Sequence, residues 1–217
     1  MSRYADATVY IIDDDADHLS SLKELIESIS LKTKAYQSPT EFYADYDPSL
    51  WSCLLLDVRL DGFNGLDMLE EMPDKKIRIP AIMISAYAKV PMAVRAMKSG
   101  AVDFLQKPFD EQELLDRIYT ALDTDKRARD NEIEEAKLAE LRDRLTPREV
   151  DVMKFVVDGM SNREIAEKLE LSKKTVEVHR ARLMAKLEVH TVVDLVRLGL
   201  LMFRSEFENR KPPKVNV

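Results

Sequence analysis

Five short apolar runs alternate with amphipathic stretches between residues 8 and 122. Each run has the length of a strand, and the stretch that follows it carries apolar residues at helical spacing. This alternation predicts an α/β domain with a parallel sheet covered by helices on both faces, because consecutive parallel strands are joined by right-handed crossovers. Sheets of this kind bind ligands at the carboxyl ends of their strands, so we expect the functional residues there.

Acidic residues stand where two of these runs end. Asp13 and Asp14 follow the first run, and Asp57 ends the third, SCLLLD. An ionised carboxylate at the end of a buried strand costs free energy unless it is paired. The first and third strands can lie side by side, so we expect the acids to meet at one edge. Carboxylates completed by water are the ligands that Mg²⁺ favours, and no His or Cys is positioned nearby to indicate zinc.

Two other strand ends add a hydroxyl and an ammonium group. Ser85 ends the fourth run, and Lys107 follows the fifth, directly before Pro108. Carboxylate, cation, hydroxyl and ammonium together suit a phosphoryl group, with Asp57 as the nucleophile. Each signal alone is weak, since an Asp after a strand is more often a helix N-cap and Lys-Pro often marks only a loop. Whether the Lys107–Pro108 bond is cis stays open at this point.

The charge of −7 is divided unevenly along the chain. Residues 1–124 carry 13 Lys and Arg against 22 Asp and Glu, and residues 146–217 carry 14 against 11. The acidic half suits a cation site, and the weakly basic half suits a polyanion. Residues 123–144 lack Gly and Pro and predict a helical linker. Leu138, Leu141 and Leu145 leave a short dimeric coiled coil as an alternative.

The chain shows no membrane or export signal. Its longest apolar runs fall well short of the roughly 20 residues that span a bilayer, and its first residues lack a signal-peptide pattern. We therefore expect a cytoplasmic protein with no membrane contact. The single Cys53 excludes an intramolecular disulfide, and its apolar surroundings predict core packing.

Residues 145–204 predict a small all-α domain of four helices. Thr or Ser is placed as N-cap before each helix, at Thr146, Ser161, Ser172 and Thr191. The third helix has a narrow apolar stripe and an otherwise largely basic surface, which suits the major groove of DNA, although a charged face is often merely solvated. Residues 205–217 predict a polar C-terminal tail.

The motifs IIDDD, LLLD, MISA and AVDFLQKPF make residues 8–122 resemble the receiver domain of two-component response regulators. The resemblance implies a flavodoxin-like (βα)5 receiver over residues 1–122, in which Asp57 accepts a phosphoryl group from a sensor histidine kinase. It also implies a cation site, in which Asp14, Asp57 and the Arg59 carbonyl bind Mg²⁺ (or Mn²⁺) and Asp13 acts through water. Lys107 would contact the phosphoryl group. Ser85 and Phe104 would be the switch pair.

Two features of this region bear on regulation. Leu60 and Asp61 stand where the family usually has Met-Pro, which places metal affinity and phosphoryl lifetime in question. The stretch AKVPMAVRAMKSGAVDF resembles FixJ-type regulators, in which phosphorylation exposes a dimer face, here with Val94 and Lys98. The alternative is that the apolar stripe of this helix only packs on the sheet.

The last domain resembles the LuxR-type helix-turn-helix along its whole length, from LTPREV to AKLEV. The resemblance implies contacts to base edges from Glu177, Val178 and Arg182. It implies phosphate contacts from Asn162, Lys173, Lys174, Thr175, Arg180 and Lys186. The last helix, around Val193 to Leu200, would form the DNA-bound dimer contact, and His179 has no assigned role.

These resemblances together indicate a DNA-binding response regulator of the FixJ/NarL type. It would bind a double-stranded DNA operator as a homodimer when phosphorylated. It would not be an enzyme, although the receiver would catalyse its own phosphoryl transfer and dephosphorylation. One alternative is a phosphorylation-independent DNA binder with the receiver as a dimerisation scaffold. Another is a Mg²⁺-dependent aspartyl-phosphate phosphatase, but those enzymes have D-x-D at the nucleophile, and Arg59 holds the second position here.

Overall fold

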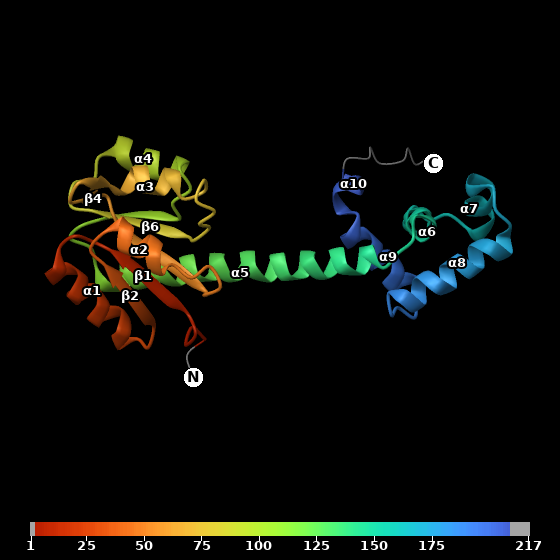
Figure 1. Cartoon of the computed structure of the whole chain (residues 1–217), viewed down its shortest axis with the longest axis horizontal. Coiled ribbons are helices and arrows are strands. Elements are labelled where there is room, and N and C mark those ends of the chain that lie inside the picture. Colours follow the sequence, from red (N-terminus) through yellow and green to blue (C-terminus); the bar gives the residue numbers. More distant parts are fainter. Residues whose placement is uncertain (1–2, 209–217) are drawn as a thin grey trace. The chain divides into compact units, whose positions relative to one another are not determined.

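The computed structural model of the chain describes residues 3–208. The chain divides into two compact units, unit 1 comprising residues 1–130 and unit 2 comprising residues 131–217. Figure 1 shows the elements of both units. Within the described part of the chain, no helix combines the length and the apolar character needed to cross a lipid bilayer.

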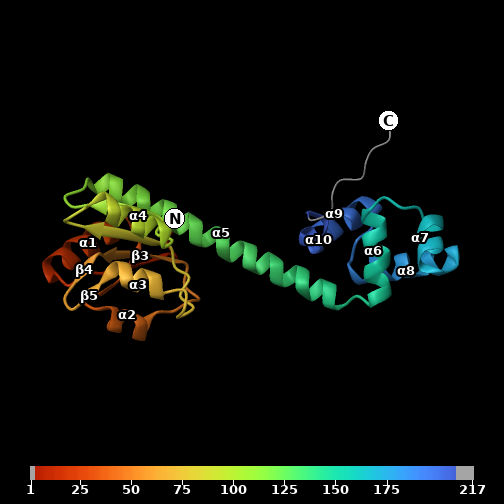
Figure 2. The same cartoon turned by 90° about the horizontal axis from the view of Figure 1, so that it is seen from above.

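Unit 1 is built on one parallel sheet with the strand order β2-β1-β3-β6-β7. Figures 1 and 2 show this sheet and its helices from two directions. Its strands are β1 (Thr8–Ile12), β2 (Lys32–Tyr36), β3 (Ser52–Asp57), β6 (Ala81–Ser85) and β7 (Asp103–Gln106). A short antiparallel hairpin, β4 (Arg59–Leu60) and β5 (Phe63–Asn64), follows β3. The order confirms the flavodoxin-like fold, and it places β1 beside β3.

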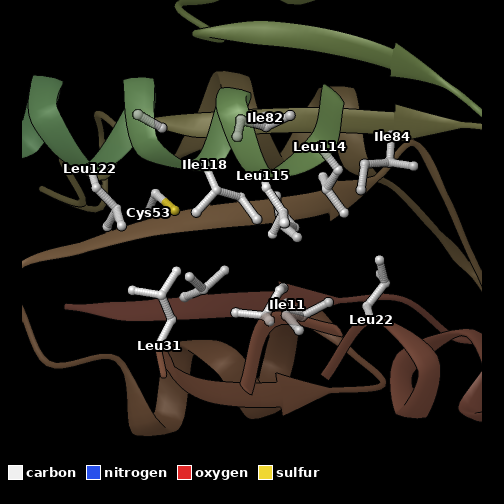
Figure 3. Close-up of a cluster of buried hydrophobic side chains, with 14 of the residues drawn as sticks. Ile11, Leu22, Leu31, Cys53, Ile82, Ile84, Leu114, Leu115, Ile118 and Leu122 are labelled. Carbon is white, nitrogen blue, oxygen red and sulfur yellow. The ribbon is translucent and has the colours of Figure 1, made fainter. Parts of the chain in front are cut away.

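Helices cover both faces of this sheet. They are α1 (Ala16–Ser28), α2 (Pro39–Asp45), α3 (Gly65–Glu71), α4 (Val90–Lys98) and α5 (Glu111–Asp143). Helices α1 and α5 pack on one face, and α2, α3 and α4 on the other. Figure 3 shows Leu114 and Ile118 of α5 packed over Ile11 and Cys53 of the sheet. Cys53 is fully buried, which confirms its role in the core, and burial raises the pKa of its thiol.

Helix α5 continues without a break into the region predicted as a linker. Asp125 is 3% exposed; its carboxylate accepts hydrogen bonds from the Ser52 amide at 2.9 Å and from Arg129 Nε at 2.6 Å. Trp51 Nε1 also donates to the Leu122 carbonyl at 2.7 Å. Residues up to Arg129 therefore pack on unit 1, and the compact units divide at 130/131. The predicted domain boundaries at 122/123 and 144/145 remain predictions.

The described part of unit 2, residues 131–208, contains helices and no strand. Its further helices are α6 (Pro147–Val157), α7 (Asn162–Leu169), α8 (Lys173–Lys186), α9 (Val192–Met202) and α10 (Arg204–Glu208). Each of the four predicted Thr or Ser residues caps its helix, accepting a hydrogen bond from the third helical amide. At Thr146 and Ser161 a glutamate three residues later completes a capping box.

The C-terminal tail differs from the prediction. We expected residues 205–217 to be a polar tail, but residues 204–208 form α10. Phe203 is buried and Phe207 packs partly on the same core, one helical turn later. Glu206 pairs with Lys154 of α6 at 2.5 Å. This apolar pair and this ion pair explain the extra helical turn, and residues 209–217 lie outside the described residues.

The three leucines of the alternative coiled coil, Leu138, Leu141 and Leu145, pack within unit 2. Leu145 is buried, and Leu138 and Leu141 are partly buried against the core formed by α6 to α9. The leucine spacing is therefore accounted for by packing within one chain, which favours a connecting helix over the alternative of a dimeric coiled coil.

Candidate functional site

Two buried carboxylates meet at the carboxyl edge of the sheet in unit 1. The β1–β3 register pairs Ile12 with Leu56, so Asp13 and Asp57 emerge side by side, as predicted. They are 3% and 8% exposed. Lys107 Nζ bridges them, donating to Asp13 Oδ2 at 2.8 Å and to Asp57 Oδ2 at 2.5 Å. This ammonium group explains how the sheet holds two carboxylates at one edge. We call Asp13, Asp57 and Lys107 the carboxylate edge.

Backbone groups hold the second oxygen of each carboxylate. The Arg59 amide donates to Asp57 Oδ1 at 2.8 Å, and the Asp15 amide donates to Asp13 Oδ1 at 3.0 Å. Asp14, the third predicted acid, is exposed beside them. The Lys107–Pro108 peptide bond is cis. Both buried carboxylates are thus fixed in orientation from two sides.

Burial and hydrogen bonding act differently on the two carboxyl groups. Burial raises the pKa of Asp13, but hydrogen bonds from His18, Lys107 and the Asp15 amide outweigh it and hold that pKa at about 2. At Asp57, burial prevails over the bonds from Lys107 and Arg59, and its pKa is raised. Burial lowers the pKa of Lys107, but its hydrogen bonds to both carboxylates raise that pKa by more. The net shift is upward. The two carboxyl groups are therefore shifted in opposite directions, by burial at Asp57 and by hydrogen bonding at Asp13.

The predicted switch residues lie on the adjoining strands. Ser85 ends β6, is 1% exposed, and accepts a hydrogen bond from the Tyr87 amide at 3.2 Å. Its strand pairs with β3, with Ile84 opposite Asp57. Phe104 on β7 lies opposite Met83 and packs partly against the core. The hydroxyl therefore lies at the same edge as Asp57, and the switch roles remain predictions.

The loop after Asp57 departs from the usual family sequence but is well ordered by packing. Leu60 is 6% exposed and belongs to the core that α2, α3 and α4 cover, whereas Asp61 is exposed. The Arg59 guanidinium lies over the Tyr87 ring, 4.3 Å from its centroid. Leucine therefore fills a core position here, and the loop closes as the β4–β5 hairpin without the usual proline.

Sequence reasoning missed two residues at this edge. We expected no histidine positioned to indicate zinc, but His18, the third residue of α1, lies close enough for its Nδ1 to contact Asp13 Oδ2. Gly65 was also missed. A Cβ at this position would lie 2.1 Å from the Asp57 carbonyl oxygen, so only glycine allows α3 to start so close to β3. A glycine eight residues after the acid was the available signal.

The donors at this edge fit a hard divalent cation. Within residues 3–208, no group of three or more His, Cys, Asp and Glu side chains is arranged as a ready metal cage. Two buried carboxylates and the adjacent exposed Asp14 are instead the small oxygen set that Mg²⁺ takes, with water completing its shell. No thiolate is present at the edge to favour a softer metal.

Helix α8 of unit 2 presents the predicted DNA-contacting residues. Lys173, Lys174, Glu177, Val178 and Arg182 are exposed. Its apolar stripe, Val176 and Leu183, is buried in the core of unit 2. One face of α8 is therefore held by packing, and a mostly charged face is left open to solvent. The residues on that face remain predictions for contacts with bases and phosphates.

Other residues predicted to contact phosphates are engaged within unit 2. Arg180 donates to Asn162 Oδ1 at 2.5 Å, joining α8 to the first turn of α7. Lys186 donates to Glu149 Oε2 at 2.6 Å and to the Arg144 carbonyl at 3.0 Å. Glu149 is 2% exposed, so Lys186 neutralises a buried acid. These contacts favour a structural role for Lys186.

The two predicted dimer faces are exposed. On α4, Val94 is 47% exposed and Lys98 is also exposed, while Ala96 is fully buried against the sheet. On α9, Val193 is 76% and Leu200 47% exposed. Helix α4 thus packs on the sheet through Ala96, and the dimer role of the exposed Val94 and Lys98 remains a prediction.

Comparison with known proteins agrees with this geometry. Residues 9–119 match the response regulator receiver domain, and residues 143–198 match the luxR family of bacterial regulatory proteins. The chain is 41% identical to nodulation protein W of Bradyrhizobium diazoefficiens, covering 89% of this chain and 85% of that protein. It is 37% identical to the transcriptional regulatory protein FixJ of Rhizobium meliloti, covering 90% and 96%. The solved structure of the response regulator StyR matches with a TM-score of 0.80 at 35% identity, covering 89% of this chain and 98% of that one.

The chain belongs to the response regulators that join a receiver domain to a LuxR-type DNA-binding domain.

Proposed function

We propose that Asp57 is phosphorylated by a sensor histidine kinase and that this modification controls dimerisation and transcription. The observation that supports it best is the pair of buried carboxylates bridged by Lys107 at the carboxyl edge of the sheet. A structural ion pair alone does not require a second buried acid. A site for a phosphoryl group requires a nucleophile and positive charge, which Asp57 and Lys107 would supply at this edge.

The chemistry follows from the contacts of Asp57. A carboxylate oxygen of Asp57 attacks phosphorus, the new oxygen–phosphorus bond forms, and the bond to the donor histidine nitrogen breaks. The Arg59 amide and the Lys107 ammonium orient the carboxylate before attack. Lys107 then neutralises charge on the transferring oxygens. The same groups support hydrolysis of the acyl phosphate, so the receiver catalyses its own modification without turning over a separate substrate.

A divalent cation, Mg²⁺ or Mn²⁺, is the cofactor that we propose for this edge. Asp14, Asp57 and the Arg59 carbonyl would hold it directly, with Asp13 acting through water. When bound, it would supply further positive charge for the phosphoryl oxygens. Acidic residues outnumber basic ones at the edge, which supports this assignment.

We propose that the phosphoryl group is read by Ser85 and Phe104 and passed on through α4. The Ser85 hydroxyl, buried at the same edge, would bond the phosphoryl group, and Phe104 would move into the space it leaves. This change favours a conformation that is already accessible. The exposed Val94 and Lys98 would then form a homodimer contact.

Unit 2 would bind a double-stranded operator in the cytoplasm. Glu177, Val178 and Arg182 are proposed for base edges, because they are exposed on the second and third turns of α8. Lys173, Lys174 and Thr175 at its N-terminus are proposed for phosphates. The exposed residues of α9 from Val193 to Leu200 would join two DNA-bound copies.

A phosphorylation-independent DNA binder is the second candidate. The replacement of Met-Pro by Leu60 and Asp61 favours it, since Asp61 adds negative charge to the loop beside the nucleophile. The phosphatase alternative lacks its general acid, because Arg59 occupies that position and packs on Tyr87.

Intact mass of the full chain tests phosphorylation. Wild type, Asp57→Asn and the matched control Asp61→Asn would be incubated with Mg²⁺ and acetyl phosphate. We expect one added phosphoryl group on wild type and on Asp61→Asn, and none on Asp57→Asn. An adduct on Asp57→Asn, or none on any variant, would contradict the proposal.

A further inference from the structure

His18 contacts two of the three residues of the carboxylate edge. Its Nδ1 contacts Asp13 Oδ2 and lies 3.1 Å from Lys107 Nζ. The His18 side chain is 25% exposed, so most of the ring is enclosed. None of the roles proposed above involves this residue.

The chemistry of Asp13 determines which His18 nitrogen carries hydrogen. The Asp13 carboxyl lies against two groups that can only donate, the Lys107 ammonium and the Asp15 amide, so it is ionised there and only accepts hydrogen bonds. The hydrogen must therefore lie on Nδ1, which donates to Oδ2. Lys107 donates to that same oxygen, and the Asp15 amide donates to Oδ1. Asp13 thus accepts from three donors.

These donors compete with a cation for Asp13. A divalent cation at this edge is attracted by Asp13, Asp14 and Asp57 and repelled by Lys107. The His18 N–H dipole directed at Asp13 adds to that repulsion. It also holds Oδ2 in place beside Lys107. Each effect reduces what Asp13 contributes to cation binding.

We propose that His18 is a positioning residue that lowers the affinity of the carboxylate edge for divalent cations by holding Asp13 against Lys107. The inference rests on the proposed cation site. It makes the cation requirement of this receiver depend on a side chain that is not itself a ligand. In the opposite case His18 would bind the metal through Nδ1, which would require it to lose that hydrogen and leave Asp13.

Direct Mn²⁺ binding to the full chain tests the inference. Free Mn²⁺ would be measured by electron paramagnetic resonance, with Mg²⁺ added as competitor. His18→Leu removes the donor and keeps the bulk, so we expect roughly tenfold tighter binding, opposite in sign to the loss seen when a residue that supports a metal ligand is changed. His18→Asn places an amide N–H where Nδ1 lies and should bind like wild type. His190→Leu, an exposed histidine of unit 2, is the matched control and should also bind like wild type.

The outcomes separate this inference from the proposed function. Unchanged or weaker binding by His18→Leu would overturn it, and weaker binding would indicate a ligand. Loss of binding in Asp14→Ala would support the cation site whichever result His18→Leu gives. Absence of saturable binding in wild type and His18→Leu alike would overturn both proposals.

The rate of phosphoryl incorporation gives a second measurement. His18→Leu should reach the wild-type rate at saturating Mg²⁺ and exceed it only at low Mg²⁺. A lower rate at saturating Mg²⁺ would contradict a role confined to cation affinity.

Discussion

The carboxylate edge of unit 1 and helix α8 of unit 2 hold their functional side chains in opposite ways. At the edge, Asp13 and Asp57 are almost fully buried, and each contacts groups from other elements. On α8, Lys173 and Arg182 are exposed, and only the opposite face of the helix is packed. Substitutions at the edge should therefore change stability together with chemistry, whereas substitutions on the exposed face of α8 should change binding alone.

The largest effect is expected where α3 starts against β3. Gly65→Ala places a Cβ 2.1 Å from the Asp57 carbonyl oxygen, a backbone atom that cannot move freely. We expect unit 1 to lose roughly 3 kcal/mol or more of unfolding free energy. Urea unfolding followed by fluorescence of Trp51, the single tryptophan, measures this in unit 1.

Gly199→Ala in α9 is the matched change in unit 2. Its Cβ would lie 2.5 Å from Val157 Cγ2, a side-chain atom that can shift. The cost should therefore be smaller, and alanine recovers helix propensity of about 1 kcal/mol. If circular dichroism showed a larger loss for Gly199→Ala than for Gly65→Ala, the contrast between a rigid and an adaptable contact would be wrong.

Lys186 tests whether a basic residue of α8 is structural. Lys186→Met leaves the buried Glu149 carboxylate with the Thr146 amide but without its cation. We expect unit 2 to lose roughly 2 kcal/mol, below the cost of breaking a fully buried pair because Lys186 is partly exposed. Lys173→Met, on the same helix, should leave stability unchanged by circular dichroism in urea. Equal stability of the two variants would contradict the structural role of Lys186 and favour a phosphate contact instead.

The two buried acids should respond to pH with opposite sign. Asp13 has a folded pKa of about 2, below the ordinary 3.8, so it stabilises unit 1 above that ordinary value and loses its effect as pH falls toward 2. Asp57 has a raised pKa, so its ionisation opposes folding as pH rises past the ordinary value. At pH 7 we expect Asp13→Asn to lower the unfolding free energy by roughly 2 kcal/mol and Asp57→Asn to increase it.

Trp51 fluorescence in urea at pH 7 and pH 3 measures both differences, which should shrink at the lower pH. The exposed Asp61→Asn is the control and should match wild type at both. Destabilisation by Asp57→Asn at pH 7 would show that the bond to Lys107 prevails over burial.

The smallest effects concern DNA. Arg182→Ala should relax preference at particular base pairs, and Lys173→Ala should weaken binding to all sequences alike, each by roughly 1 kcal/mol. Lys173→Ala should also reduce, by about one, the slope of the logarithm of the binding constant against the logarithm of the salt concentration. Fluorescence anisotropy on a selected operator and on single-base variants measures both. Unchanged operator binding by both variants would place the recognition face elsewhere.

Sequence predicted the features that depend on local pattern. The parallel sheet follows from the strand–helix alternation, and its flavodoxin-like arrangement from the resemblance to receiver domains; the acids meet because β1 and β3 are neighbours. The four helix N-caps of unit 2 were also predicted, since a capping hydroxyl acts within its own turn. These features need only chain connectivity and the nearest few residues.

What sequence could not predict depends on side chains meeting across elements. Asp125 lies in a charged stretch that has the composition of a solvated helix, yet the Ser52 amide and Arg129 pair with it in the interior. Lys186 lies on a largely basic helix and was predicted to contact DNA, but it neutralises Glu149. His18 follows Asp13 by five residues, and only the start of α1 brings it back to that carboxylate. Such contacts leave no periodic pattern in the sequence.

Operator affinity with and without phosphorylation tests the central claim that the carboxylate edge controls α8. An operator recovered by selection from random duplexes would be titrated with wild type and Asp57→Asn, each with Mg²⁺ and with or without acetyl phosphate. We predict that the phosphodonor raises the affinity of wild type and leaves Asp57→Asn unchanged. Equal affinity of wild type in both conditions, with phosphorylation verified by intact mass, would contradict the account and leave the receiver as a dimerisation scaffold.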